Sequence, residues 1–248
     1  MGKRKTMLRL ENISWTAPDG TKVLDDVSLT IPDGKLVVVT GPNGGGKTTL
    51  AKIIAGIVKP DSGRIYFNDT DITDFDVTDR AKSGISFAFQ QPVRFKGVTV
   101  RQLLNIAAGR ELDYSGLCEI LSSVGLCASE YMEREVSGAL SGGEIKRIEI
   151  ATVIARRTSL SVFDEPEAGI DLWSFANLIK AFQKIHKDLG GTLMIISHQE
   201  RILRIADEIV LLADGKLGAS GPAEEMMEKV LSSKSAVYAC RKQEVAFS

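Results

Sequence analysis

The segment between residues 35 and 57 combines three patterns that few folds accommodate together. Lys35–Val39 is a continuous run rich in β-branched residues, which is typical of a strand buried on both faces of a parallel sheet. A glycine-rich loop, Gly41–Thr48, follows it at once. Apolar residues then recur at helical spacing, at Leu50, Ile53, Ile54 and Ile57. The order strand, glycine loop, helix predicts an α/β fold that presents this loop at one end of a central strand.

The loop fits the pattern G-x-x-x-x-G-K-[ST], which binds phosphate groups. Its glycines let backbone N–H groups converge on phosphate oxygens, and the helix that follows points its positive end at them. In this pattern Lys47 reaches the β- and γ-phosphates, and the Thr48 hydroxyl ligates Mg²⁺. The residues that we expect to bind the nucleotide here are Gly41, Pro42, Asn43, Gly44, Gly45, Gly46, Lys47, Thr48 and Thr49.

Two adjacent acids follow a later apolar run, Leu160–Phe163. A carboxylate at the carboxyl end of a parallel strand lies where open α/β sheets place their ligands. Asp164 is therefore expected to hold Mg²⁺, and Glu165, one residue on, to polarise an attacking water. The alternative is that the two acids cap the turn after the strand.

A second glycine turn comes directly before a long helical pattern. Ser141, Gly142, Gly143 and Glu144 form this turn. Such a helix start is a second anion-binding nest, and one phosphate loop needs no second nest for the same nucleotide. A composite site shared between two chains is one interpretation, and a purely structural loop is the other.

Three further side chains are candidates, each with a structural alternative. His198, one of only two histidines, follows the predicted strand Leu193–Ile196 and is placed to sense a γ-phosphate, whereas His186 is expected to be solvated. Gln90 is expected to contact the metal or the attacking water, or else to be a turn residue. Trp15 is expected to stack on an adenine ring or to belong to the core.

The remaining periodicity outlines the fold. Alternating apolar residues before the loop predict two antiparallel strands at the amino-terminal end. A helical segment is expected over residues 99–136, beginning with a capping box between Thr99 and Gln102. Strand and helix patterns alternate afterwards, which predicts right-handed βαβ units in a parallel sheet. These patterns cover Leu160–Phe163, residues 172–189, Leu193–Ile196 and Ile209–Leu212, with a short helix after Pro222.

Charge and cysteine content narrow the partners and the compartment. The 31 Lys and Arg residues balance 32 Asp and Glu, which gives a net charge of −1 and argues against a nucleic-acid partner. The three cysteines form no C-x-x-C pair, and no apolar run approaches the length of a membrane span. We therefore expect a cytoplasmic protein.

Taken in this order, the motifs resemble those of the ATP-binding-cassette (ABC) ATPases over nearly the whole chain. The resemblance makes Gly41–Thr48 the Walker A loop, Gln90 the Q-loop glutamine, and Ser141–Glu144 the signature that meets the ATP of a second cassette. Asp164 and Glu165 match the Walker B pair, Asp171 belongs to the D-loop, His198 is the switch histidine, and Trp15 is the adenine-stacking aromatic.

The resemblance also implies an architecture and a mechanism. It predicts one P-loop NTPase domain over residues 1–248, with a mainly parallel core, an amino-terminal antiparallel β subdomain and a small helical subdomain at about 92–139. Two such domains would stack head to tail around Mg²⁺ and ATP. Hydrolysis would reopen the dimer and move a partner, which family members contact through the helical subdomain.

The branch of the family is a separate question. Phe87–Val93, Ser141–Glu149 and His198–Leu203 resemble the ATPase subunit of the SUF iron–sulfur cluster assembly system, which acts on a scaffold protein. Three departures favour the alternative, the ATP-binding subunit of a membrane transporter with a permease partner. Asp164-Glu165-Pro166 is closer to transporter cassettes, Ile145 replaces a lysine, and Gly45 replaces a serine or alanine.

Overall fold

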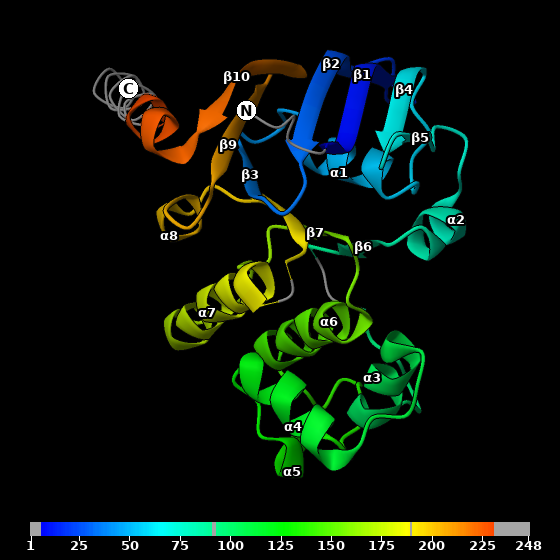
Figure 1. The fold of residues 1–248 in the computed structure, drawn as a ribbon, viewed down its shortest axis with the longest axis vertical. Helices are drawn as coiled ribbons and strands as arrows, with labels where there is room; N and C mark the ends of the chain where they lie inside the picture. The colour runs from blue at the N-terminus through cyan, green and yellow to red at the C-terminus, as the bar shows by residue number, and fades with distance from the viewer. Residues whose placement is uncertain (1–5, 91–92, 189, 231–248) are drawn as a thin grey trace, which may run out of the picture.

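The computed structural model describes residues 6–90, 93–188 and 190–230. Two β-sheets form the upper body and helices form most of the lower part in Figure 1. The smaller sheet is antiparallel, with the order β2-β1-β4-β5. Its strands are β1 (Thr6–Thr16), β2 (Lys22–Pro32), β4 (Ser62–Phe67) and β5 (Thr70–Asp71). The predicted antiparallel amino-terminal subdomain is therefore confirmed.

The larger sheet has six strands in the order β10-β9-β3-β8-β7-β6. All neighbouring pairs are parallel except β9 and β10, so the mainly parallel core is also confirmed. The strands are β3 (Leu36–Thr40), β6 (Ile85–Ala88), β7 (Leu160–Asp164), β8 (Thr192–Ile196), β9 (Glu208–Ala213) and β10 (Lys216–Pro222). β10 had no counterpart among the expected elements.

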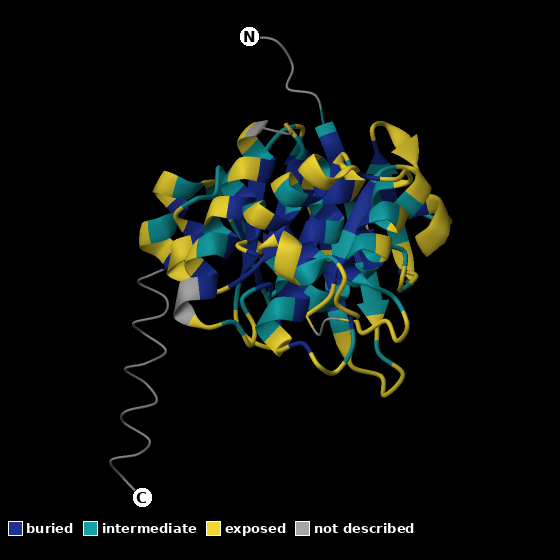
Figure 2. Cartoon of the chain, turned by 90° about the horizontal axis from the view of Figure 1, so that it is seen from below, coloured by how far each residue is buried: buried dark blue, intermediate teal, exposed yellow. Residues whose placement is uncertain are grey.

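Strand β3 divides the hydrophobic core because its two faces pack into different clusters. Val37 and Val39 pack against the antiparallel sheet and helix α1 (Lys47–Ile54), which lies between the sheets. Leu36 and Val38 belong to the cluster formed with the helices on the other face. All five residues of β3 are buried, as the continuous apolar run predicted, and Figure 2 shows that buried segments fill the interior of the chain. Helix α1 thus starts directly above a rigid, buried strand.

The other helices lie mostly on the side away from the antiparallel sheet. They are α2 (Val77–Lys82), α3 (Val100–Ala108), α4 (Tyr114–Ser123), α5 (Ala128–Tyr131), α6 (Gly142–Arg156), α7 (Leu172–Asp188) and α8 (Glu200–Leu203), and residues 223–230 are also helical. We call α3, α4 and α5 the helical lobe. Helix α6 lies between this lobe and the six-stranded sheet.

The segment expected to be helical over residues 99–136 holds three helices. The capping box of Thr99 and Gln102 does start α3, but Gly109 ends that helix in the left-handed conformation, at φ 65°. Asp113 then caps α4 through the Gly116 N–H, and Gly125 follows with φ 73°. Turn residues therefore divide the segment into three helices.

Helix α2 was not expected, and it carries a buried arginine. The Arg80 guanidinium donates hydrogen bonds to the carbonyl oxygens of Ile53 and Ile54 in the last turn of α1. It also donates to the carbonyls of Phe75 and Thr73 in its own segment. A cation at the carboxyl end of a helix satisfies its free carbonyls. Arg80 therefore fixes the far end of the helix that begins at the phosphate loop.

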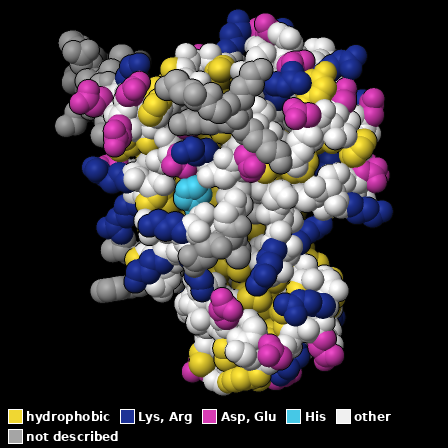
Figure 3. Space-filling view, viewed as in Figure 1, with side chains coloured by type: hydrophobic (Ala, Val, Ile, Leu, Met, Phe, Trp, Pro, Cys, Tyr) yellow, Lys and Arg dark blue, Asp and Glu magenta, His cyan; other side chains and the backbone are white. Residues whose placement is uncertain are grey.

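Charged side chains of both signs cover the visible face of the molecule (Figure 3). Positive and negative side chains are interspersed on the face seen in Figure 3, in keeping with the net charge of −1. Within the described ranges, no helix combines the length and apolarity needed to cross a bilayer.

Candidate active site

The glycine loop connects β3 to α1 and is packed closely against neighbouring strands, most clearly at Gly41 and Gly46. A Cβ atom on Gly41 would lie 1.9 Å from the Leu212 carbonyl oxygen of β9, and φ is 144° there. Gly46, the N-cap of α1, has φ 94°, and its Cβ would lie 2.7 Å from the Val23 carbonyl oxygen. These approaches press the loop onto both sheets, so its shape is set by long-range packing.

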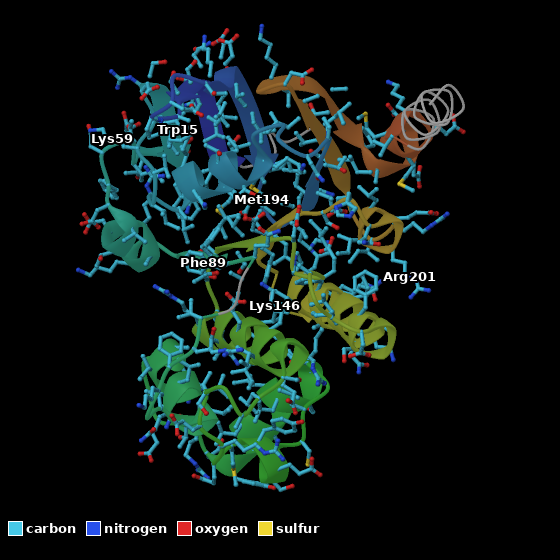
Figure 4. The ribbon with its side chains drawn as sticks, turned by 180° about the vertical axis from the view of Figure 1, so that it is seen from behind. Trp15, Lys59, Phe89, Lys146, Met194 and Arg201 are labelled. Atoms are coloured by element: carbon cyan, nitrogen blue, oxygen red, sulfur yellow. The ribbon has the colours of Figure 1, made fainter. Side chains whose placement is uncertain are left out.

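The loop borders a pocket of about 350 Å³ that gathers most of the predicted site. The lining residues are Val23, Asn43, Gly44, Gly45, Gly46, Lys47, Thr48, Thr49, Gln90, Glu165 and His198. Trp15 is not among them. Its indole is partly buried against the core beside the antiparallel sheet, where Trp15 pairs with Leu24, and Figure 4 shows it among those strands. Adenine stacking by Trp15 stays a prediction.

Lys47 is folded back onto its own loop. Its Nζ donates to the carbonyl oxygens of Gly41 at 2.9 Å and Pro42 at 2.8 Å, and only 6% of the residue is exposed. Burial lowers the pKa of Lys47, while the charges of Glu165 and Asp164 oppose this shift. A desolvated ammonium group held only by carbonyls is well suited to meet an anionic phosphate.

Thr48 and Asp164 meet across the pocket floor, although 116 residues separate them. The Thr48 hydroxyl donates to Asp164 Oδ1 at 3.1 Å. Asp164 ends β7 and is 1% exposed, and this burial raises its pKa, with the Thr48 hydrogen bond opposing the shift. A hydroxyl beside a buried carboxylate is a hard-oxygen donor set, which fits Mg²⁺.

Glu165 has an unusual backbone and an occupied side chain. Its φ is 43°, in the left-handed region, and its N–H donates to the Ile196 carbonyl oxygen of β8 at 3.0 Å. The Gln90 amide Nε2 donates to Glu165 Oε2 at 2.6 Å. The structure therefore brings Gln90 to Glu165, and this contact occupies one acceptor site of the carboxylate.

A neighbouring acid, Glu167, escaped the sequence reasoning. Ser197 Oγ donates to Glu167 Oε1 at 2.5 Å, which links the turn after β7 to the turn that carries His198. Burial raises the pKa of Glu167, and the nearby His198 opposes that shift. The signals were an acid two residues after Glu165 and a serine directly before His198, but neither predicts the pairing.

The predicted signature turn lies outside the phosphate pocket. Ser141 caps α6 in a capping box: its Oγ accepts from the Glu144 N–H at 3.2 Å, and Glu144 Oε2 accepts from the Ser141 N–H at 2.7 Å. Tyr131 Oη also donates to Glu144 Oε1, and these hydrogen bonds lower the Glu144 pKa. Glu144 is thus engaged within its own chain, while Ser141 and Gly142 are exposed.

Asp171 and His186 both have partners within the chain. Asp171 caps the first turn of α7, since it accepts from Ser174 N at 3.0 Å and from Ser174 Oγ at 2.6 Å. The expectation that His186 is merely solvated is wrong. Its Nε2 lies 3.1 Å from Asp207 Oδ2, because α7 ends beside the turn that precedes β9.

The arrangement matches known proteins along most of the chain. Residues 24–168 match the family model described as ABC transporter. An uncharacterized ABC transporter ATP-binding protein of Methanocaldococcus jannaschii, MJ0035, is 38% identical, over 84% of this chain and 86% of its own length. The sulfate/thiosulfate import ATP-binding protein CysA of Synechocystis sp. is 36% identical over 88% of this chain, which spans 61% of that protein.

Solved structures show the same architecture. A nucleotide-free ATP-binding cassette from an ABC transporter has a TM-score of 0.77 and 30% identity, covering 92% of this chain and 95% of its own. The dimeric post-hydrolysis state of the cassette MJ0796, bound to ADP and Pi, has a TM-score of 0.77 and 25% identity, covering 88% and 99%. The cassette MJ0796 therefore binds ADP with the same fold as the one described above.

Proposed function

The chain belongs to the ABC transporter family of ATPases, and we propose that it is an ATP-binding subunit whose hydrolysis cycle drives a conformational change in a membrane permease. ATP binding and hydrolysis follow from the family. The permease is supported by relatives such as the sulfate/thiosulfate import protein. These relatives favour the transporter alternative over iron–sulfur assembly, which neither of the named relatives supports.

The pocket supports a division of labour in hydrolysis. Lys47 and the loop N–H groups would hold the phosphates, and Thr48 with Asp164 and Gln90 would hold Mg²⁺. When bound, Mg²⁺ would neutralise charge on the transferred phosphoryl group. Glu165 would polarise the attacking water, and His198 would contact the γ-phosphate from the opposite wall. The Gln90–Glu165 hydrogen bond keeps the base engaged until nucleotide arrives.

The exposed signature turn supports a head-to-tail dimer. Ser141 and Gly142 are exposed and do not line their own chain's pocket. Their helix is capped internally by Glu144, so the turn keeps its shape without a ligand. A dimeric state is documented for the cassette MJ0796. We propose that Ser141, Gly142 and Gly143 meet ATP held by a second copy.

One observation carries the assignment of a partner: an apolar groove adjoins Gln90. It is a cavity of about 160 Å³ between the segment after β6 and the helices α3 and α6, with Phe89, Val93 and Phe95 at its edge. Phe89 is 39% exposed and Phe95 is 41% exposed. Exposed apolar side chains around a groove mark an interaction site. A helix of the permease seated there would sense the position of Gln90.

Affinity purification of the chain from detergent-solubilised native membranes tests this proposal. We expect a polytopic membrane protein to co-purify with the wild type, and Phe95→Asp to lose it while keeping ATP hydrolysis. Tyr114→Asp is the matched control, because Tyr114 is 54% exposed on α4 and does not line the groove. A permease that stays bound to the Phe95 variant would contradict the proposed groove.

A second candidate function is ATP-driven iron–sulfur cluster assembly on a scaffold protein. The observation that favours it is the run Glu144–Glu149, which carries Lys146 and Glu149 where the SUF ATPase pattern has a lysine and an acid. Capture of a scaffold protein in the same purification, in place of a permease, would select this candidate.

A further inference from the structure

An ion pair on helix α6, between the buried Lys146 and the largely buried Glu149, contacts the chain just before Gln90, and the proposed hydrolysis mechanism does not use it. Lys146 is 1% exposed, and its Nζ lies 3.0 Å from Glu149 Oε2, one turn further along the helix. Figure 4 shows Lys146 and Phe89 together where the upper body meets the helical part. The pair therefore sits at the junction between the sheet and α6.

The two side chains hold both peptide groups of Phe89. Glu149 Oε1 accepts from the Phe89 N–H at 2.8 Å, and the Lys146 ammonium donates to the Phe89 carbonyl oxygen. That carbonyl carbon is bonded to the backbone nitrogen of Gln90, whose side chain donates to Glu165. A continuous series of short contacts thus runs from α6 to the proposed base.

Stability alone is a weak reason for such a pair. Desolvating two charges costs much of what their attraction returns, and apolar replacements of similar size are often as stable. Burial raises the pKa of Glu149, and the charge of Lys146 opposes this shift. Lys146 thus favours the ionised form of the Glu149 carboxylate. What apolar side chains do not supply is two directional hydrogen bonds to one residue of the loop.

We propose that Lys146 and Glu149 are positioning residues that act as one clasp on Phe89. The clasp makes Gln90 move with helix α6, whose first residues follow the signature cap Ser141. When Ser141 contacts the ATP held by a second copy, any shift of α6 would move Gln90. That movement would break or form the hydrogen bond between Gln90 and Glu165. This inference rests on the proposed roles of Gln90, Glu165 and Ser141.

The test compares single and double variants of the purified chain with Mg-ATP and no partner. Lys146→Met or Glu149→Leu alone leaves a buried charge and lowers the thermal midpoint. The double variant Lys146→Met with Glu149→Leu removes both charges and recovers most of that midpoint. If the clasp positions Gln90, the kcat of the double variant stays about tenfold below that of the wild type, while its KM for ATP changes less than twofold.

Arg156→Met is the matched control, because Arg156 is a cation on the same helix that donates to a backbone carbonyl, that of Ala81, at 2.9 Å. It should change the thermal midpoint without changing kcat. A double variant that recovers both midpoint and wild-type kcat would overturn the clasp.

Glu149→Gln gives a second comparison that does not depend on the double variant folding. The glutamine keeps an acceptor for the Phe89 N–H, so its kcat should exceed that of Glu149→Leu several-fold, and equal values would overturn the clasp. If the transporter proposal is wrong, no permease is captured in the affinity purification, which is a different measurement from kcat. The role of Glu165 is checked separately, by measuring ATP hydrolysis by the Glu165→Gln variant.

Discussion

The phosphate loop and the signature turn both begin a helix with glycines, yet they are prepared for ligand in opposite ways. The N-cap of α1 is Gly46, with no side-chain hydrogen bond to the free N–H groups of the first turn. The N-cap of α6 is Ser141, whose capping box with Glu144 satisfies two donors. The first helix start leaves its donors for a phosphate, whereas the second is complete without one.

The difference suggests how one chain contributes two unlike half-sites. The phosphate loop takes its shape from sheet packing, at Gly41 and Gly46, and is proposed to bind nucleotide by itself. The signature turn takes its shape from local hydrogen bonds and is proposed only to complete a site that another copy has begun. Substitutions in the two regions should therefore fail in different assays.

Removing the group that both half-sites serve has the largest expected effect. Glu165→Gln replaces a carboxylate with an amide that cannot polarise water, so turnover should fall about 100- to 10,000-fold. ATP affinity measured by calorimetry should change little. In ATP, size-exclusion chromatography should show an accumulated dimer, in which the two half-sites are joined. Normal turnover would remove Glu165 from its proposed role.

A methyl group in the phosphate loop should break that half-site through packing. Gly41→Ala places Cβ against the Leu212 carbonyl, and we expect a loss of roughly 3 kcal/mol in unfolding free energy and of ATP binding. Gly44→Ala is the matched control: φ is also positive, at 80°, but no atom lies within 4 Å of its Cβ, so strain of about 1 kcal/mol is expected. Denaturant unfolding and calorimetry measure both, and equal losses would contradict the packing argument.

The signature half-site should lose activity without losing nucleotide affinity. Ser141→Ala removes a helix cap, at a cost of about 1 kcal/mol, and should lower turnover about tenfold because the second ATP loses a contact. Thr99→Ala removes the equivalent cap of α3 in the helical lobe at a similar cost. If both variants hydrolyse ATP at the same rate, the signature turn is only a cap.

At Asp164 the expected effect on folding stability is small and opposite in sign to the effect on catalysis. Burial raises its pKa above the ordinary 3.8, so the ionised form is less favourable in the folded state than in the unfolded state. This group's contribution is therefore complete below about pH 4 and is lost as pH rises through the folded pKa. Asp164→Asn should raise the thermal midpoint of the nucleotide-free protein at pH 7, with no gain in acid. It should also abolish Mg²⁺-dependent hydrolysis, and a lower midpoint at pH 7 would contradict the sign.

The features that can be predicted from the sequence are those that depend on residues close together along the chain. Continuous apolar runs predict β3, β7, β8 and β9, and the glycine pattern predicts the phosphate loop, because each depends on neighbours within one element. Helix α2 was missed because its six residues carry no apolar stripe, although Asp76 is a clear N-cap. Its stability comes from Arg80, whose partners in α1 lie 26 and 27 residues away.

Long-range pairing limits the prediction of the site in the same way. Asp164, Glu165 and Thr48 could be named because motif spacing reports on them. The clasp could not, since Lys146 lies 57 residues from Phe89 and its buried charge resembles a surface lysine in the sequence. His186 failed for the same reason, because its partner Asp207 lies on another element.

The contact between Arg80 and the end of α1 also limits how small a piece containing the phosphate loop can be excised or grafted. An excised nucleotide-binding piece that stopped after α1 would leave the carbonyls of Ile53 and Ile54 without their donor. A grafted or minimised version of this loop must therefore include Arg80 and α2, besides β2 and β9, whose backbone the loop glycines contact.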